Sequence, residues 1–513
     1  MGDYKPTEQV LAAGRSSLGN LFLERARMQP DTLAVEEDGV LTTYGDLATR
    51  VLKLANALKG QGVERGDRIG LLCHNRREYL EGELAAALIG AITACLNWRL
   101  VGAELSHCVT LVTPKLMICD PEQAARLDEL DIPDIPRLIL GEDYETVLEA
   151  ADDTNDHPLV DPEEGLVILY TSGTTGLPKG ALISHRAMIA RALVFASELH
   201  LAYDDHFVAW APFFHMASTD HALATILRGG AVIVVDGYQP APLIDAAERY
   251  KVGWFVVIPG MIEDFINHLN AKPFRPKGIR FIGAMADLVP PHQLVEVTRL
   301  LDAPFFNSFG STETGVLPGS RSMVEIGVPP VRLSKIQGAF CEVRLVDADE
   351  NEVGIGEPGD LAIRGATVFS GYWNAPETNA EDFRHGWFHN GDVFRRNADG
   401  TIDFLDRAKY MIKSGGENVY PAEIERVLLS DPHVQDAAVV KAPDNKWGES
   451  PVAFVATDDA SVTETTLMAL CRQELAGYKR PREIHFIGID DFPRSTSGKV
   501  QRHELEARYR EGK

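Results

Sequence analysis

The sequence predicts an α/β protein with two unequal parts. A large N-terminal domain would combine doubly wound sheets with a distorted β-barrel, and a small, mobile α+β C-terminal domain would follow. Three observations support this fold class: short apolar runs alternate with helical patterns, tight turns dominate after Glu342, and the charge balance changes near Asp406. The 513 residues are enough for two to four packed units, at about 100–200 residues per unit.

Parallel sheets are predicted for the first part of the chain. Apolar runs rich in β-branched residues, typical of buried strands, occur at residues 68–73, 115–119, 166–170, 231–235 and 254–258. Helical patterns lie between them, for example at residues 44–58 and 78–89. Strands that alternate with helices favour parallel sheets with helices on both faces.

An antiparallel, barrel-like region is predicted after Glu342. Turns rich in Gly, Asp and Asn lie at residues 347–351, 354–360 and 397–400. Such turns join neighbouring antiparallel strands. Residues 407–513 carry a net charge of −1, although the whole chain carries −25. This change in composition predicts an N-terminal domain at 1–406 and a C-terminal domain at 407–513.

Composition makes several classes of protein improbable. A formal charge of −25 argues against nucleic-acid binding, which usually needs a basic face. No uncharged apolar run reaches the roughly 18–20 residues that span a bilayer, so no transmembrane segment is expected. The six cysteines are scattered without a Cys-x-x-Cys pair, which favours neither a zinc site nor a disulfide framework. Together with the absence of an apolar leader pattern, this makes a cytoplasmic protein the expectation.

The segment at residues 170–180, with the sequence YTSGTTGLPKG, has the chemistry of a phosphate-binding loop. Its glycines let the backbone approach a ligand, its hydroxyls supply short donors, and Lys179 supplies a positive charge. It is not a Walker A loop, because Pro178 stands where that pattern requires glycine. The loop therefore predicts a different kind of nucleotide site.

With this loop and further motifs in order, the sequence resembles the adenylate-forming superfamily, which contains acyl-CoA synthetases, adenylation domains and luciferases. The further motifs are FGSTETG at 309–315, WFHNGD at 387–392, DRAK at 406–409, SGGENVYP at 414–421 and PRSTSGK at 493–499. Each string alone is weak, but the ordered set is specific and covers nearly the whole chain. The resemblance is greatest to AMP-forming fatty-acyl-CoA ligases.

The resemblance implies an ATP site. It assigns ATP binding to Thr171, Ser172, Gly173, Thr174, Thr175, Gly176, Lys179, Phe309, Gly310, Thr312, Asp392 and Arg407. Within this set, Phe309 would stack on adenine, Thr312 would bond the α-phosphate, and Asp392 with Arg407 would hold the ribose hydroxyls. The 171–179 segment would surround the β- and γ-phosphates. The family usually has Tyr in place of Phe309, so a hydroxyl contact is lost while ring stacking is kept.

The catalytic residues implied by the resemblance are Lys499, Glu313 and His215. Adenylation brings a carboxylate to the α-phosphate, so two anions meet and the transition state needs cations and aimed donors. Lys499 would bridge the two anions. Glu313 would hold Mg²⁺, which prefers oxygen ligands. His215 would lie beside the carboxylate or gate the thiol.

The resemblance also implies a moving domain and two further subsites. Lys409 falls at the family's hinge position, about which the C-terminal domain would turn between two half-reactions. The coenzyme A tunnel would be lined by Ser414, Gly415 and Gly416, and the acyl pocket by Phe214, His215, Gly283, Ala284 and Met285. The sequence does not decide whether Asp220 and His221 add polarity to that pocket or face solvent.

The implied function is that of an AMP-forming acyl-CoA synthetase, a carboxylate–CoA ligase. It would use ATP, Mg²⁺ and coenzyme A on a hydrophobic acid, either medium-chain fatty, aromatic or alicyclic, with a homodimer as one expected assembly. The nearest alternative is a stand-alone adenylation enzyme that loads a carrier protein. A luciferase-type oxygenase would share the motifs, whereas the intact set of Lys499, Glu313, Asp392 and Arg407 argues against a catalytically silent nucleotide-binding regulator.

Overall fold

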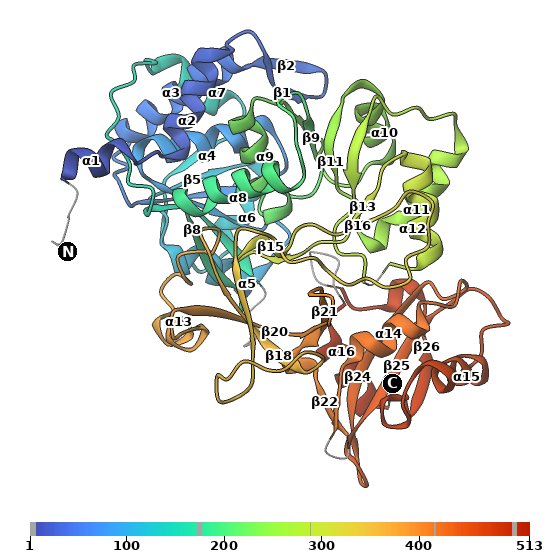
Figure 1. The fold of residues 1–513 in the computed structure, drawn as a ribbon. Helices are drawn as coiled ribbons and strands as arrows, with labels where there is room; N and C mark the ends of the chain where they lie inside the picture. Colours follow the sequence, from blue (N-terminus) through green and yellow to red (C-terminus); the bar gives the residue numbers. More distant parts are fainter. Residues whose placement is uncertain (1–6, 172–176, 288, 415–416, 495–499, 513) are drawn as a thin grey trace.

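The structure is a computed structural model that describes residues 7–171, 177–287, 289–414, 417–494 and 500–512. Within these residues the strands form five sheets, and Figure 1 shows the C-terminal part, drawn in orange and red, below the N-terminal part. The fold class predicted from the sequence is confirmed. No helix in the described ranges is both long and apolar enough to cross a membrane.

The largest sheet has eight strands. Its order is β16 (Met323–Val324), β13 (Phe305–Phe306), β12 (Ile279–Ile282), β11 (Val252–Phe255), β9 (His206–Ala209), β10 (Val232–Val234), β1 (Leu33–Glu37) and β2 (Val40–Thr43). The inner pairings are parallel, and only the edge strands β2 and β16 pair antiparallel. One predicted strand differs in its bounds. The run predicted at 254–258 overlaps β11, but β11 starts two residues earlier and ends at Phe255.

The second sheet has six strands. Its order is β6 (Arg137–Ile139), β5 (Leu116–Cys119), β3 (Arg68–Leu72), β4 (Ile92–Cys95), β7 (Gly165–Thr171) and β8 (Lys179–Ser184). All neighbours run parallel except β7 and β8. The antiparallel return places Lys179 directly opposite Thr171. The ends of the predicted phosphate loop are therefore fixed by a strand pair.

Helices cover both sheets and fill the space between them. They are α1 (Glu8–Ala13), α2 (Leu18–Met28), α3 (Tyr44–Gly60), α4 (Arg77–Ile89), α5 (Gly102–Val112), α6 (Pro121–Asp128), α7 (Glu142–Ala150), α8 (His185–Glu198), α9 (Met216–Arg228), α10 (Pro240–Arg249), α11 (Pro259–Ala271) and α12 (Pro291–Leu301). Helix α4 contacts β1 of the larger sheet and β4 of the smaller one, and its residues from Glu78 to Ile89 are all buried. This helix is therefore enclosed on all sides, and it buries even its three glutamates, Glu78, Glu81 and Glu83.

The barrel-like region is an antiparallel sheet, as the turns predicted. It contains β17 (Glu342–Val346), β18 (Pro358–Arg364), β20 (Trp387–Arg396), β19 (Phe383–Arg384) and β21 (Ile402–Arg407), with α13 (Pro376–Asp382) beside it. A separate hairpin, β14 (Phe309–Ser311) and β15 (Gly315–Gly319), lies in the chain between β13 and β16 of the eight-stranded sheet, and its Phe309 packs against the barrel region. The FGSTETG motif forms this hairpin.

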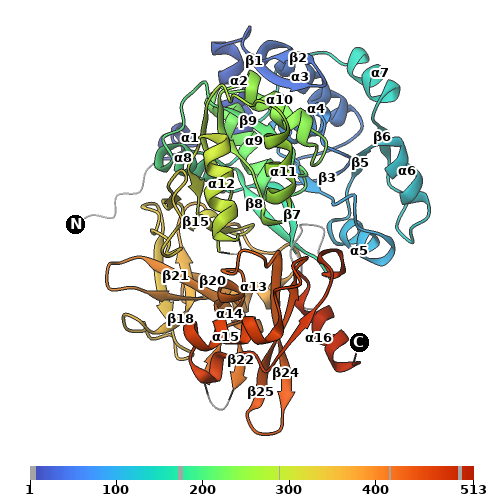
Figure 2. The same cartoon turned by 90° about the vertical axis from the view of Figure 1, so that its right-hand side faces the viewer.

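The C-terminal part has its own sheet and its own core. The sheet contains β23 (Glu417–Val419), β22 (Ile412–Ser414), β25 (Gly448–Ala456), β24 (Asp436–Asp444) and β26 (Glu483–Phe486), and the helices are α14 (Pro421–Leu428), α15 (Glu464–Glu474) and α16 (Arg502–Arg510). Figure 2 shows these elements together at one end of the molecule. The barrel sheet ends at Arg407 and this sheet begins at Ile412, with a short turn at Ala408–Tyr410 between them.

A buried charge network joins the two parts. Asp406, on β21, accepts a hydrogen bond of 2.9 Å from the backbone N–H of Ala422 and lies 3.3 Å from the Arg502 guanidinium. Arg502 also donates to Glu425, at 2.6 Å from Nη2 to Oε2. The two carboxylates are almost fully buried, so the contacts act in a low-dielectric environment. The network therefore fixes the orientation of α14 and α16 against the end of the barrel sheet.

Candidate active site

A buried carboxylate and a tyrosine form the centre of the site. Glu313 lies in the turn between β14 and β15, and only 9% of it is exposed. The Tyr372 hydroxyl donates to Glu313 Oε1 at 2.8 Å. The backbone carbonyl of Glu313 accepts from the N–H of Phe369 at 2.8 Å, which holds the turn against the barrel region. Burial and the Glu313 carboxylate raise the pKa of Tyr372, so its hydroxyl stays protonated and remains a donor.

A lysine approaches the same tyrosine from the six-stranded sheet. Lys179 begins β8, and its Nζ lies 5.0 Å from the centroid of the Tyr372 ring, in cation–π contact. The structure thus brings Lys179 and Glu313 together from distant motifs, with Tyr372 between them. Thr171 ends β7 opposite Lys179. Five predicted loop residues lie outside the described part of the chain: Ser172, Gly173, Thr174, Thr175 and Gly176.

An ion pair on the barrel sheet forms the next part of the site. Asp392 on β20 is opposite Arg407 on β21, and Arg407 Nε lies 3.1 Å from Asp392 Oδ1. Asn390 Nδ2 donates to Asp392 Oδ2 at 2.5 Å. The Asp392 carboxylate raises the pKa of Arg407, and the charge of Glu313 acts in the same direction. The pair therefore lies close to the Glu313 cluster.

The aromatic residue predicted to stack on adenine packs inside the barrel. The Phe309 ring lies 4.7 Å from that of Phe394 and 5.0 Å from that of Phe404, measured between centroids. Only 6% of Phe309 is exposed, and Met285 packs against the same cluster. Stacking on adenine stays a prediction, and it would use the small part of this ring that faces outward.

The neighbouring predicted residues have structural partners as well. A Cβ on Gly310 would collide with the backbone carbonyl of Gly315, so the tight β14–β15 hairpin itself requires glycine there. The backbone carbonyl of Thr312 accepts from Arg191 Nη2 at 2.9 Å. Arg191, a buried residue of α8 (His185–Glu198) that the motifs did not identify, therefore holds the predicted α-phosphate segment in place.

The residues predicted for the acyl pocket follow the carboxyl ends of strands in the eight-stranded sheet. Phe214 and His215 follow β9, and Gly283 follows β12; parallel strands bring their carboxyl ends to the same edge. His215 caps α9, since its Nδ1 accepts from the N–H of Ala217 at 3.1 Å. Gly283 has φ +76°, and a Cβ there would collide with the ring of Phe305. Next to Gly283, Ala284 packs on the main core.

The side chains left open by the sequence are buried. Asp220 and His221, on the first turns of α9 (Met216–Arg228), are only 3% and 4% exposed. Asp220 Oδ2 accepts from Arg191 Nη1 at 2.9 Å. The alternative that these two residues face solvent is therefore wrong. Arg191 connects them to the carbonyl of Thr312 described above.

The predicted hinge residue lies between the barrel sheet and the C-terminal sheet. Lys409 is in the short turn at Ala408–Tyr410, with its Nζ 4.9 Å from the centroid of the Tyr410 ring. Ser414 ends β22 and is buried. Gly415, Gly416 and Lys499, the lysine predicted to be catalytic, lie outside the described residues.

The residues present fit a nucleotide with Mg²⁺. Lys179 and Arg407 supply positive charge, Asp392 offers a carboxylate for hydroxyl groups, and Glu313 offers one for a cation. Among the described residues, no group of three or more His, Cys, Asp or Glu side chains could hold a metal ion alone. Magnesium usually binds through one or two carboxylates together with phosphates and water, so a single carboxylate fits this ion.

Comparison with known proteins gives consistent results. A feruloyl-CoA synthase from Amycolatopsis sp is 35% identical over 96% of this chain and 99% of that protein. An indoleacetate–CoA ligase from Aromatoleum aromaticum is 31% identical over 94% of this chain and 96% of that protein. The structure of an o-succinylbenzoate CoA synthetase from Bacillus subtilis, in complex with its acyl-adenylate intermediate, has a TM-score of 0.83 at 26% identity, covering 95% of this chain and 98% of that one.

Two family models match the chain in order. The model described as AMP-binding enzyme matches residues 22–373, and the model described as AMP-binding enzyme C-terminal domain matches residues 423–499. The first match alone covers more than half of the sequence and includes the Glu313 cluster. The chain belongs to the AMP-binding enzyme family, the adenylate-forming superfamily that its motifs indicated.

Proposed function

We propose that this protein is an AMP-forming carboxylate–CoA ligase that activates an aromatic acid. A carboxylate oxygen attacks the α-phosphorus of ATP, and the bond to the β-phosphate breaks to release pyrophosphate. The thiol sulfur of coenzyme A then attacks the acyl carbon, AMP leaves, and the thiol proton is released. The observation that carries this proposal is the convergence of Lys179, Glu313, Asp392 and Arg407, from four separate segments, on one place.

The described residues have distinct roles in the first half-reaction. Asp392 accepts hydrogen bonds from the ribose hydroxyls, and Arg407 keeps that carboxylate charged and in position. Lys179 attracts the terminal phosphates. Glu313 would hold Mg²⁺, which would neutralise charge on the phosphates, and the Tyr372 hydroxyl fixes the rotamer of Glu313. Thr312 contributes its hydroxyl to the α-phosphate while Arg191 holds its carbonyl.

An aromatic acid is favoured over a fatty or alicyclic one. Feruloyl-CoA synthase, indoleacetate–CoA ligase and o-succinylbenzoate CoA synthetase are named for aromatic acids. In this chain Trp254, whose Nε1 donates to the carbonyl of Gly283, packs edge to face against Phe195. A planar ring fits between aromatic side chains with favourable offset or edge contacts.

The second half-reaction requires the C-terminal domain, 407–513, to turn against the rest of the chain, 1–406. We place the hinge at Lys409, because the barrel sheet ends at Arg407 and the next sheet begins at Ile412. Ser414, with Gly415 and Gly416, then lines the passage for the pantetheine arm. Lys499 serves the first half-reaction by bridging the carboxylate and the α-phosphate.

Tyr372→Phe tests the position of Glu313. The variant keeps the ring under Lys179 but removes the hydroxyl that donates to Glu313. A hydrogen bond to a charged group contributes about 1.5–3 kcal/mol, so we expect the Mg²⁺ concentration for half-maximal activity to rise about 10-fold. Initial rates across a magnesium titration measure this. Tyr203→Phe, at an exposed position, is the control, and an unchanged magnesium dependence in Tyr372→Phe would contradict the assignment.

Asp406→Asn tests the contact across the hinge. Asp406 precedes Lys409, whereas its partners Ala422 and Arg502 follow it. Turning at Lys409 must therefore break these contacts, and weakening them shifts the balance between the two orientations. We expect the ratio of the adenylation rate to the thioester-forming rate to change about 10-fold, equal to about 1.4 kcal/mol. The two half-reactions are measured separately, and an equal change in both rates would show a merely structural role.

The proposed function is tested by mass spectrometry of products. The intact protein is incubated with ATP, Mg²⁺, coenzyme A and a panel of straight-chain, branched, alicyclic and aromatic acids. A new aromatic acyl-CoA supports the proposal. Acyl-adenylate without any acyl-CoA would instead indicate a carrier-protein acceptor, and no product with any acid would refute the ligase assignment. Light emission with a luciferin separates the oxygenase alternative, and native mass spectrometry tests for a homodimer.

A further inference from the structure

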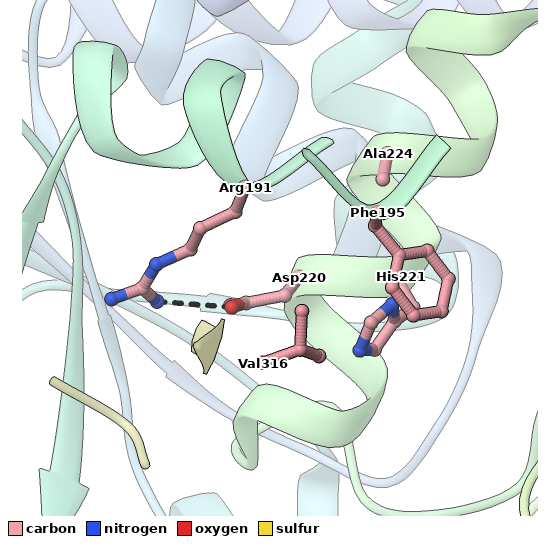
Figure 3. A pocket seen from close by; sticks show the side chains of 6 residues that line it. All are labelled: Arg191, Phe195, Asp220, His221, Ala224 and Val316. Carbon is pink, nitrogen blue, oxygen red and sulfur yellow. Dashed lines mark hydrogen bonds and ion pairs between the residues drawn. The ribbon is translucent and has the colours of Figure 1, made fainter. Parts of the chain in front are cut away.

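A small cavity lies behind the Thr312 segment, between two helices and a strand. Its volume is about 10 Å³, enough for roughly one water-sized group. It is lined by Arg191 and Phe195 of α8, Asp220, His221 and Ala224 of α9, and Val316 of β15. Figure 3 shows the Arg191 and Asp220 side chains meeting on one side and the rings of Phe195 and His221 on the other.

Three polar atoms at this cavity lack hydrogen-bond partners among the described residues. They are Asp220 Oδ1 and both ring nitrogens of His221. The other oxygen of Asp220 accepts from Arg191 Nη1 at 2.9 Å. Buried polar atoms are nearly always hydrogen-bonded, and leaving one unsatisfied costs about 1–3 kcal/mol. The cluster therefore indicates that a further group binds here in the functional protein.

The chemistry of the cluster defines that group. Burial, together with the positive charges of Arg228 and Arg191, lowers the pKa of His221 to about 3, so the ring is neutral with one donor nitrogen and one acceptor nitrogen. Asp220 is already paired with Arg191, so the site carries no net charge to attract an ion. Asp220 Oδ1 can only accept, which requires a donor. A neutral hydroxyl satisfies both residues, because it donates one hydrogen bond and accepts others.

The surroundings favour a hydroxyl on an aromatic ring. The His221 ring lies between Phe195 and Trp254, with centroids 4.2 Å away in each case. Trp254 Nε1 donates to the carbonyl of Gly283 at 2.5 Å, which connects the cavity to the predicted acyl pocket. Arg191 connects it to Thr312 on the nucleotide side. The cavity is thus next to the place where the acid must lie.

We propose that this cavity receives a ring hydroxyl of the substrate, so that His221 and Asp220 select a hydroxylated aromatic acid. This inference rests on the proposed ligase function and specifies its substrate class. The carboxylate of the acid points to the α-phosphate near Thr312, the ring lies in the acyl pocket predicted at Gly283, and only its hydroxyl enters the cavity. The hydroxyl donates to Asp220 Oδ1 and accepts from the donor nitrogen of His221. An acid without this hydroxyl leaves Asp220 Oδ1 and the donor nitrogen of His221 unsatisfied, and this produces the discrimination.

The test compares cinnamic acid with its 2-, 3- and 4-hydroxy derivatives. For the unmodified protein, kcat/KM is measured for each acid by pyrophosphate release and by formation of the acyl-CoA. Sites that hydrogen-bond a substrate hydroxyl can reject the analogue without it by a factor of up to about 10⁴–10⁵. We expect one hydroxylated acid to exceed cinnamic acid by about 100-fold or more. A preference below about threefold for every hydroxylated acid would overturn the proposal.

Two variants identify the residues responsible. His221→Phe keeps an aromatic ring but removes both nitrogens, and Asp220→Asn keeps the shape but replaces an acceptor by a donor. We expect each variant to reduce the ratio of kcat/KM between the preferred hydroxylated acid and cinnamic acid by about 10-fold or more. His292→Phe, at an exposed position, is the matched control and keeps the ratio. An unchanged ratio in both variants would mean that the cavity holds only a structural water.

The ratio separates this inference from the proposed function and from effects on folding. A poorly folded variant loses activity toward both acids equally, so its ratio stays constant, and thermal unfolding measures that loss directly. Acyl-CoA formed from all four acids at similar rates would overturn the hydroxyl site while supporting the ligase. If no acid in the panel described above yields an acyl-CoA, the ligase assignment itself is overturned.

Discussion

Lys499→Ala is expected to abolish formation of the acyl-adenylate while leaving the thioester-forming step largely intact. In the first half-reaction the attacking carboxylate and the α-phosphate are both anions, and a bridging ammonium offsets their repulsion and the charge that develops in the transition state. Removing a cation of this kind from phosphoryl or nucleotidyl transfer costs about 10³-fold or more in rate. In the second half-reaction the thiol attacks the neutral acyl carbonyl of the mixed anhydride, so the same lysine has no comparable role.

Two assays measure this difference. Pyrophosphate exchange into ATP reports the first half-reaction, and conversion of supplied acyl-adenylate to acyl-CoA reports the second. Lys446→Ala, at an exposed lysine of the same domain, is the control and changes neither rate. Equal loss of both half-reactions in Lys499→Ala would refute the assignment of two orientations about Lys409. Loss of the second half-reaction alone would reverse the assignment.

Much of the architecture follows from local patterns in the sequence. The alternation of apolar strands with helical patterns predicted the parallel sheets, because strands buried on both faces are continuously apolar. The Gly, Asp and Asn turns after Glu342 predicted antiparallel strands. The order of strands within each sheet did not follow from local pattern. For example, β10 pairs with β1, almost two hundred residues away in sequence, through contacts that only tertiary packing determines.

The candidate site could be predicted where a motif carries it, and not where distant packing does. Glu313, Asp392 and Arg407 stand in recognisable strings, so the sequence identified them. Tyr372, whose hydroxyl bonds Glu313 from 59 residues away, follows no pattern that marks it as functional. Arg191 was missed for the same reason, since it lies within an ordinary helix and its partners come from other elements.

Two residues that the resemblance assigned to ATP binding, Gly310 and Phe309, also have a packing role that explains their identity. Gly310 is required by the approach of the β14–β15 hairpin to itself, because any side chain there would meet the carbonyl of Gly315. Phe309 fills the barrel core with Phe394 and Phe404. Asp220 and His221 show the opposite case: the sequence left them open, and only their burial and their unpaired atoms gave them a role.

Asp392→Ala is expected to lower kcat/KM for ATP about 10²-fold or more, mainly through KM. Two ribose hydroxyls bound to one carboxylate form charge-assisted hydrogen bonds, each contributing about 1.5–3 kcal/mol. The variant also releases Arg407, whose guanidinium is now paired at 3.1 Å. Steady-state kinetics with varied ATP measures the effect.

A matched control lies on the same pair of strands. Asp403 on β21 pairs with Arg395 on β20 at 3.2 Å, opposite it in the strand register and away from the Glu313 cluster. Asp403→Ala therefore removes a similar ion pair from the same ribbon and should leave the KM for ATP unchanged. If both variants raise that KM equally, the effect is one of barrel stability and not of ribose binding.

Deoxynucleotides make the same prediction sharper. The unmodified protein should use 2′-deoxy-ATP and 3′-deoxy-ATP much less efficiently than ATP, because each lacks a hydroxyl that Asp392 would bind. In Asp392→Ala the acceptor is gone, so the three nucleotides should be used with similar efficiency. A variant that merely distorts the sheet would lower all three rates and keep their ratios. Loss of discrimination, rather than loss of activity, therefore identifies Asp392 as the residue that binds the ribose.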